Sequence, residues 1–119
     1  MPLAGASVAI TIANNTDQPL FLQNSSTQNG EFIAAPRAVL APFQSEIVTA
    51  HSYDPSGVGV YVTYSLRDGP QAVLAANGYE DAANLDGTYI SGNAGRWGID
   101  RSLATEYPAV NAAFTIYRA

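Results

Sequence analysis

Residues 57–66 read Gly57-Val58-Gly59-Val60-Tyr61-Val62-Thr63-Tyr64-Ser65-Leu66 and alternate along their whole length. One face of this alternation is uninterrupted and apolar, and it is made of Val58, Val60, Val62, Tyr64 and Leu66. Side chains two positions apart point to the same face of a β-strand, so the pattern predicts a strand with one buried face. The other face carries both polar and apolar residues, as is typical of a solvent-exposed surface. We expect this strand to be central in its sheet.

The same period of two continues on both sides of this strand. Asp68-Gly69 supplies a tight turn into a strand over residues 71–76. Other strands are predicted over residues 6–13, 19–23, 31–34, 45–50, 88–91, 97–99 and 112–117. Residues 78–87 are too short to stand as a helix and are predicted to be a loop, as is the polar run 24–30. The total is about eight or nine strands, at the spacing of a sandwich.

The length of 119 residues suits one domain, which we place over residues 1–119. The chain has no cysteine, so its stability must come from packing and not from disulfides. Apolar residues make up 47% of the chain and charged residues 13%, which predicts a chain that folds unaided. The predicted fold class is therefore all-β, a two-sheet antiparallel β-sandwich.

Charge narrows the range of partners. Ten acidic residues against five arginines and no lysine give a net charge of -5. Binding of nucleic acid needs a stripe of cations, so we expect no nucleic-acid partner. The small number of cationic residues also argues against simple adsorption to anionic lipid, although a neutral or zwitterionic headgroup remains a suitable ligand.

The first seven residues contain no basic segment, and no stretch of about 18 apolar residues follows. We therefore expect a soluble protein without a signal peptide or transmembrane segment. It would be cytoplasmic as made and would act at target membranes outside the cell after release or deposition.

Catalytic signals are weak. His51 is the single histidine, and no nucleophile elbow, phosphate loop or dinucleotide fingerprint is present. We interpret His51 as a solvated loop residue and expect a binding protein, not an enzyme, with no catalytic residue and no cofactor.

One loop contains several side chains with oxygen atoms that could bind a metal ion, namely Glu80, Asp81, Asn84 and Asp86, but their spacing is not that of an EF-hand. A solvated acidic loop is the favoured interpretation, so we predict no metal site.

Aromatic side chains among glycines give the remaining hint of function. Tyr and Trp suit both the headgroup region of a membrane and the face of a sugar, and an adjacent Arg can hold a phosphate. The predicted lipid- or ligand-binding residues are Tyr79, Tyr89, Arg96, Trp97 and Arg101. For Trp97 an equal alternative is that the indole belongs to the core.

Several motifs occur in a characteristic order. They are Val8-Ala9-Ile10-Thr11-Ile12-Ala13-Asn14-Asn15-Thr16, Leu20-Phe21-Leu22, Asn29-Gly30-Glu31-Phe32, the strand over 57–66, Asn77-Gly78-Tyr79 to Asp86-Gly87, and Ala113-Phe114-Thr115-Ile116-Tyr117. In this order the chain resembles the aegerolysins, and in particular the small bacterial members that form half of binary insecticidal crystal toxins. The likeness runs along most of the chain.

The resemblance implies a β-sandwich that binds specific membrane lipids peripherally and permeabilises membranes only with a larger second toxin protein. The better-known fungal members are longer and have clusters of tryptophan, whereas this chain has one, so their lipid specificity does not carry over. Two other functions stay open: a lectin-like module that stacks sugars on Tyr79, Tyr89 or Trp97, and a structural protein that self-assembles through its sheets.

Overall fold

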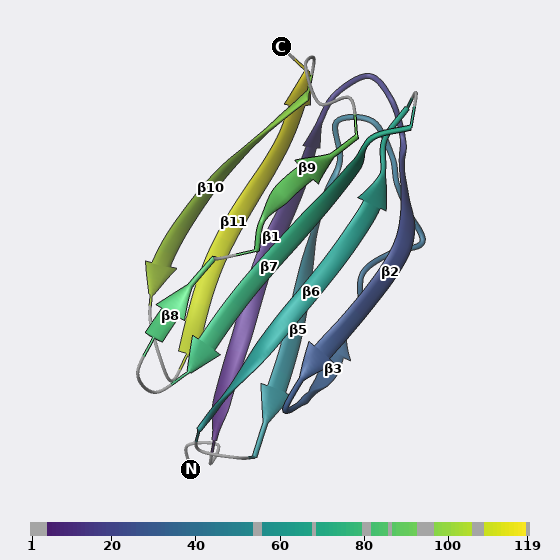
Figure 1. Ribbon diagram of the computed structural model, residues 1–119. Helices are drawn as coiled ribbons and strands as arrows, with labels where there is room; N and C mark the ends of the chain where they lie inside the picture. The colour runs from purple at the N-terminus through teal and green to yellow at the C-terminus, as the bar shows by residue number, and fades with distance from the viewer. Residues whose placement is uncertain are drawn as a thin grey trace.

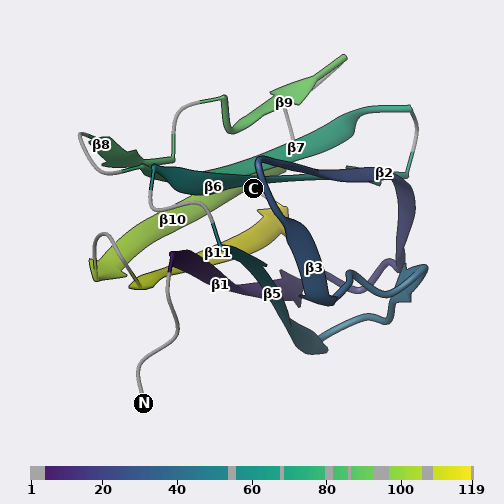
Figure 2. The same ribbon diagram turned by 90° about the horizontal axis from the view of Figure 1, so that it is seen from below.

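The computed structural model describes residues 5–53, 56–67, 69–79, 82–85, 87–92, 97–105 and 109–118. In these residues the chain forms two β-sheets packed face to face and no helix (Figures 1 and 2). The first sheet has the order β10 (Trp97–Thr105), β11 (Ala109–Arg118), β1 (Ala6–Asn15), β5 (Ser45–Ser52), β3 (Glu31–Ala34). The second has the order β4 (Val39–Leu40), β2 (Leu20–Gln28), β6 (Gly57–Ser65), β7 (Gln71–Tyr79), β8 (Ala82–Asn84), and β9 (Tyr89–Ser91) also pairs with β7. The predicted two-sheet β-sandwich is confirmed.

β6 occupies the middle of its sheet, between β2 and β7, as its alternation predicts. All five side chains of its apolar face are buried, Leu66 just beyond the strand included. They face Ile10 and Ile12 of β1, which are also fully buried, and Phe114 of β11, across the space between the sheets. The core is therefore made by the inward faces of the central strands of both sheets.

The first sheet departs from the fully antiparallel prediction at one pair of strands. β1 runs antiparallel to β5 but parallel to β11, with Ser7 opposite Ala109 and Asn15 opposite Tyr117. The other pairs among the described strands are antiparallel. A strand near the start of the chain is thus held beside one near its end.

Several predicted boundaries are wrong. Gly78 and Tyr79 extend β7, and residues 82–84 form β8 against it, where a loop was predicted. Residues 24–28 continue β2 along β6 after a bulge, because the ladder uses backbone groups and tolerates polar side chains on an exposed face. β10 continues to residue 105. The prediction ended it too early because the residues from Asp100 to Ser102 are polar and exposed, so apolar alternation is absent there.

His51 is not a solvated loop residue. It lies in β5, which runs two residues beyond the predicted end, and the side chain is only 5% exposed. Its ring packs edge to face against Tyr53 with centroids 4.7 Å apart. Within the part of the chain that the structure describes, neither ring nitrogen has a hydrogen-bond partner. The error arises because the strand continues, so that residue 51 pairs with Ser7 of β1 on one side and with Glu31 of β3 on the other.

The two sheets approach each other closely at Gly78 on β7. A Cβ atom at this position would lie 2.6 Å from Cγ2 of Val110 on β11 and 3.2 Å from Cγ2 of Val8 on β1. Atoms at the first of these distances overlap, so the absence of a side chain at Gly78 sets the local separation of the sheets.

Asn14 joins two connections at the end of β1. Its buried amide group donates to the carbonyl oxygens of Gln18 at 2.7 Å and of Leu40 and Ala41 at 3.2 Å each. Its side-chain oxygen accepts from the backbone N–H and the hydroxyl of Thr16. One side chain therefore fixes the β1–β2 connection to the turn that follows β4.

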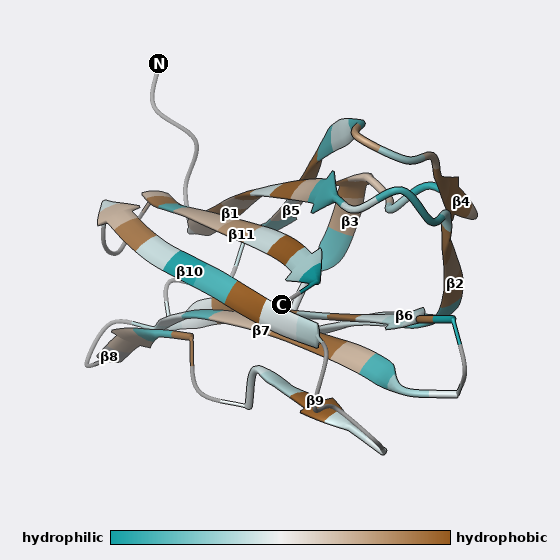
Figure 3. Ribbon diagram, turned by 90° about the horizontal axis from the view of Figure 1, so that it is seen from above, coloured by the Kyte–Doolittle hydropathy of each residue, from teal (hydrophilic) through white to brown (hydrophobic). Residues whose placement is uncertain are grey.

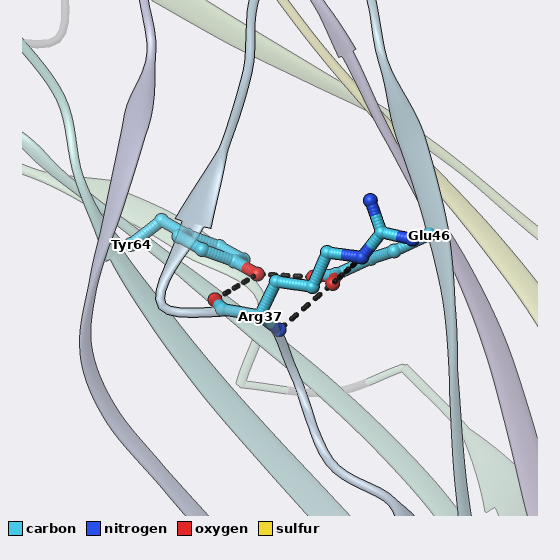
Figure 4. A network of polar contacts seen from close by, with 3 residues as sticks. All are labelled: Arg37, Glu46 and Tyr64. Atoms are coloured by element: carbon cyan, nitrogen blue, oxygen red, sulfur yellow. Dashed lines mark hydrogen bonds and ion pairs between the residues drawn. The ribbon is translucent and has the colours of Figure 1, made fainter.

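A second buried network joins the segment before β4 to both sheets (Figure 4). Tyr64 of β6 donates its hydroxyl proton to the carboxylate of Glu46 on β5. The other carboxylate oxygen accepts from the backbone N–H of Arg37 at 2.8 Å. Burial raises the pKa of Tyr64 well above its ordinary value, and the hydrogen bond to Glu46 and its negative charge raise it further.

Candidate functional site

The candidate site is a hollow where β9 of one sheet lies next to β10 of the other. Its volume is about 270 Å³, and its lining consists of Thr88, Tyr89, Ile90, Trp97, Ile99 and Arg101. A second hollow of about 450 Å³ shares Thr88 and Arg101 and continues along β10 to Ser102 and Leu103. Figure 3 shows β8 and β10 on the side of the molecule away from β4.

Arg101 connects the two sheets across this hollow. Its guanidinium Nη1 donates to the carbonyl oxygen of Thr88 at 3.0 Å. Thr88 is itself fixed, because its buried hydroxyl accepts from the N–H of Ala75 at 3.1 Å and lies 3.2 Å from the carbonyl oxygen of the same residue. With the described residues the guanidinium uses one of its five donors in this way, and the others can meet an anionic group in the hollow.

Trp97 belongs to the core and also lines the hollow. The indole is only 8% exposed. The guanidinium carbon of Arg118 lies 5.1 Å from the centre of the ring, in a cation–π arrangement. Tyr89 is 53% exposed and stands at the rim. The site therefore combines an apolar floor, an exposed aromatic ring and a fixed cation.

The structure brings together three of the five predicted site residues, namely Tyr89, Trp97 and Arg101. Arg96 lies outside the described residues. Tyr79 is elsewhere, at the end of β7, where its ring covers Gly57 and Gly59 of β6. Its hydroxyl is buried without a hydrogen-bond partner among the described residues, and this burial raises the pKa of Tyr79.

Of the acidic loop, only Asn84 is described, and its side-chain oxygen accepts from the amide of Asn77 at 3.1 Å. The described residues contain no group of three or more His, Cys, Asp or Glu side chains suited to hold a metal ion. They also contain no helix long and apolar enough to cross a membrane.

Sequence reasoning did not select Thr88, Ile90 or Ile99 as site residues. Ile90 and Ile99 lie on strands that were predicted. However, the alternation of residues in a short strand does not show which strand of the opposite sheet lies next to that strand. Thr88 carries no sequence signal, because its role depends on the hydrogen bonds to Ala75 and on the position of its carbonyl group.

No protein-family model and no curated protein matches this sequence. Comparison of folds is informative. The crystal structure of the lipid binding protein Nakanori superposes with a TM-score of 0.73 at 12% identity, over 97% of this chain and 72% of that chain. The fold is the aegerolysin-like sandwich. RahU, solved in complex with a Tris molecule, gives a TM-score of 0.72 at 7% identity over 96% of both chains. At these identities the likeness shows an aegerolysin-like fold and nothing further.

Proposed function

We propose that this aegerolysin-like chain is a peripheral lipid-binding protein and that the hollow between β9 and β10 receives a zwitterionic lipid headgroup. The observation that carries the proposal is the meeting of Tyr89, Trp97 and Arg101 around one hollow. A guanidinium group suits the phosphate of a headgroup, and amphipathic aromatic rings suit the membrane interface. The fold shared with the lipid binding protein Nakanori supports the proposal.

The charge of the chain favours a zwitterionic over an anionic lipid. With a net charge of -5, an anionic surface repels the protein as a whole. Arg101 can still hold one phosphate. The attraction between a guanidinium group and a phosphate in direct contact acts over a short distance, so salt screens it little. Recognition would then depend on local contacts in the hollow.

We further propose that the chain is the small component of a two-protein pore-forming toxin, insecticidal or cytolytic in its action. The support is the order of motifs that the sequence shares with bacterial aegerolysins, in which a larger second protein is needed for permeabilisation. On this proposal the chain alone docks on a membrane and leaves it intact.

A lectin-like function has its own support at the far end of β7. Tyr61 donates its hydroxyl proton to the side-chain oxygen of Asn77 at 2.9 Å, beside the ring of Tyr79. Aromatic rings next to side-chain amides form the kind of surface that binds sugars. A glycan array tests this alternative, and glycan binding without vesicle binding would favour it.

The deciding experiment is sedimentation of dye-loaded vesicles across a panel of lipids that includes sphingolipids. Tyr89→Ala should weaken binding at least about tenfold, the equivalent of roughly 1.4 kcal/mol, because it removes the exposed ring at the rim. Tyr53→Ala is the matched control, since Tyr53 is also exposed but lies at the end of β5 and outside the hollow. Arg101→Gln should act in the same direction as Tyr89→Ala.

Two results would count against the proposals. Equal binding by Tyr89→Ala and the unmodified protein would remove the hollow as the site. Dye release by the pure protein would contradict the need for a second protein. Trp97→Ala is a poor test, because emptying this core position costs about 3–5 kcal/mol of stability.

A further inference from the structure

The turn between β4 and β5 carries an exposed aromatic ring on strained backbone. Residues 41–44 read Ala41-Pro42-Phe43-Gln44, and the N–H of Gln44 donates to the carbonyl oxygen of Ala41 at 3.2 Å. Phe43 has a φ of 59° and is 69% exposed. Proline followed by a residue with positive φ is the pattern of a type II turn, in which glycine is the favoured third residue. A bulky residue is therefore strained there.

The surrounding structure holds this turn in place. Asn14 donates its backbone N–H to the carbonyl oxygen of Gln44 at 2.8 Å, and its side-chain amide donates to those of Leu40 and Ala41. The turn therefore cannot relax without breaking buried hydrogen bonds. The ring of Phe43 is presented to solvent by a rigid support, although both the strain and the exposure are unfavourable.

Exposed apolar side chains lie on the strands next to this turn. Phe21 and Val39 face each other across β2 and β4, and both are about half exposed. Residues 32–53 contain two charged side chains. Glu46 is buried, whereas the side chain of Arg37 is 63% exposed. The exposed charge of this segment is thus positive, although Nε of Arg37 lies 4.0 Å from Oε2 of Glu46, and the turn itself is uncharged. The exposed Asp17 lies in the β1–β2 connection, which Asn14 joins to the turn.

The turn lies at the same end of the first sheet as Trp97. Asn15, at the end of β1, is opposite Tyr117 of β11, and Arg118 of β11 is opposite Trp97, where β10 begins. Figure 1 shows β1 and β11 ending where β10 begins. The ring of Phe43 and the Trp97 end of the hollow can therefore face one membrane.

We propose that Phe43 inserts into the interfacial layer of a zwitterionic lipid bilayer while Arg37 meets the lipid phosphates. The inference rests on the proposed lipid-binding function and identifies the side chain that would anchor the protein in the membrane. A chain with a charge of -5 gains little from surface charge, so its anchor must be apolar. A ring that projects from a tight uncharged turn enters a bilayer without a preformed pocket, whereas a protein partner would have to supply one.

Phe43→Gly separates the ring from the backbone strain. Glycine accepts the positive φ, so this variant should be at least as stable to urea as the unmodified protein. It should nevertheless bind vesicles of phosphatidylcholine, with and without a sphingolipid, at least about tenfold more weakly. Tyr53→Ala is the control, because Tyr53 is 71% exposed and lies at the opposite end of β5. It should bind as the unmodified protein does.

Brominated acyl chains measure the depth of insertion. With Trp97 kept in place, the second tryptophan introduced by Phe43→Trp should add fluorescence that vesicles of brominated phosphatidylcholine quench, measured against the emission of Trp97 in the unmodified protein. A second tryptophan introduced by Tyr53→Trp should add fluorescence that these vesicles do not quench. Equal vesicle binding by Phe43→Gly and the unmodified protein, or quenching at position 53 alone, would overturn the inference.

Failure of the proposed function gives a different result. If the unmodified protein binds neither vesicles nor soluble phosphocholine, both proposals fall. If Phe43→Gly loses vesicle binding but keeps phosphocholine binding, the anchor and the headgroup site both stand. If vesicle binding depends on Phe43 and not on Tyr89, the anchor stands and the hollow does not hold the headgroup.

Discussion

At the scale of single residues, the buried pair of Tyr64 and Glu46 gives the fold a defined response to pH. Unfolded Tyr64 ionises near its ordinary pKa of about 10, whereas the folded residue keeps its proton to higher pH. Above that value the unfolded state binds fewer protons than the folded state, so the free energy of unfolding falls as the pH rises. Below that pKa, Tyr64 does not change the dependence of the free energy of unfolding on pH.

Urea unfolding from neutral to alkaline pH measures this effect. Tyr64 should contribute a loss of up to about 1.4 kcal/mol per pH unit above its unfolded pKa. Tyr64→Phe should make the slope shallower and lower the stability at neutral pH by roughly 1–3 kcal/mol, because the buried Glu46 loses a donor. Identical slopes for the two proteins would show that the fold does not hold the proton on Tyr64.

Sequence patterns predict the environment of a residue when its whole strand shares that environment. The five apolar residues of β6 are buried as predicted. His51 and Phe43 could not be placed in this way. The burial of His51 depends on two neighbouring strands, and the backbone of Phe43 is forced by hydrogen bonds from Asn14, which is distant in the sequence.

At the scale of strands, the contact at Gly78 predicts how closely β7 and β11 must pack. Gly78→Ala should lower the free energy of unfolding by about 1–3 kcal/mol, because its Cβ overlaps Cγ2 of Val110. Val110→Ala removes the overlapping methyl groups. The double variant should therefore cost less than the sum of the single ones, by at least about 0.5 kcal/mol. Additive effects in urea unfolding would contradict this account of the sheet spacing.

The strands that the sequence predicts best are those with one buried and one exposed face, such as β1 and β6. Two of the strands that it misses or shortens, β8 and β10, are edge strands and have few neighbours that demand apolar side chains. β2 and β5 lie inside their sheets and were also predicted too short. The parallel pairing of β1 with β11 could not be predicted, since local alternation contains no information about which strand lies alongside.

At the scale of the whole molecule, the net charge of -5 should govern the lipid preference. Replacing part of the phosphatidylcholine in vesicles by phosphatidylserine should weaken binding at low salt, and added salt should restore it, because the repulsion is long-ranged and screened. Sedimentation at two salt concentrations measures both effects. Stronger binding with phosphatidylserine would mean that Arg37 and Arg101 outweigh the overall charge.

The candidate site illustrates what sequence can predict at this scale. The residue types were predicted from aromatics and arginines in the second half of the chain, and three of them meet in one hollow. That meeting depends on β9 pairing with β7 and β10 with β11. Tyr79 shares the composition of the others but lies on a strand that carries it to another part of the molecule.

The parallel pairing of β1 with β11 has a consequence for biosynthesis. β1 is the central strand of its sheet, and one of its two neighbours is made about a hundred residues later. While the ribosome is still translating, the apolar residues of β1 lack that neighbour and are open to chaperones or to wrong partners. We therefore expect the sandwich to close late, when residues 109–118 have left the ribosome, and nascent chains shorter than this to be sensitive to proteases.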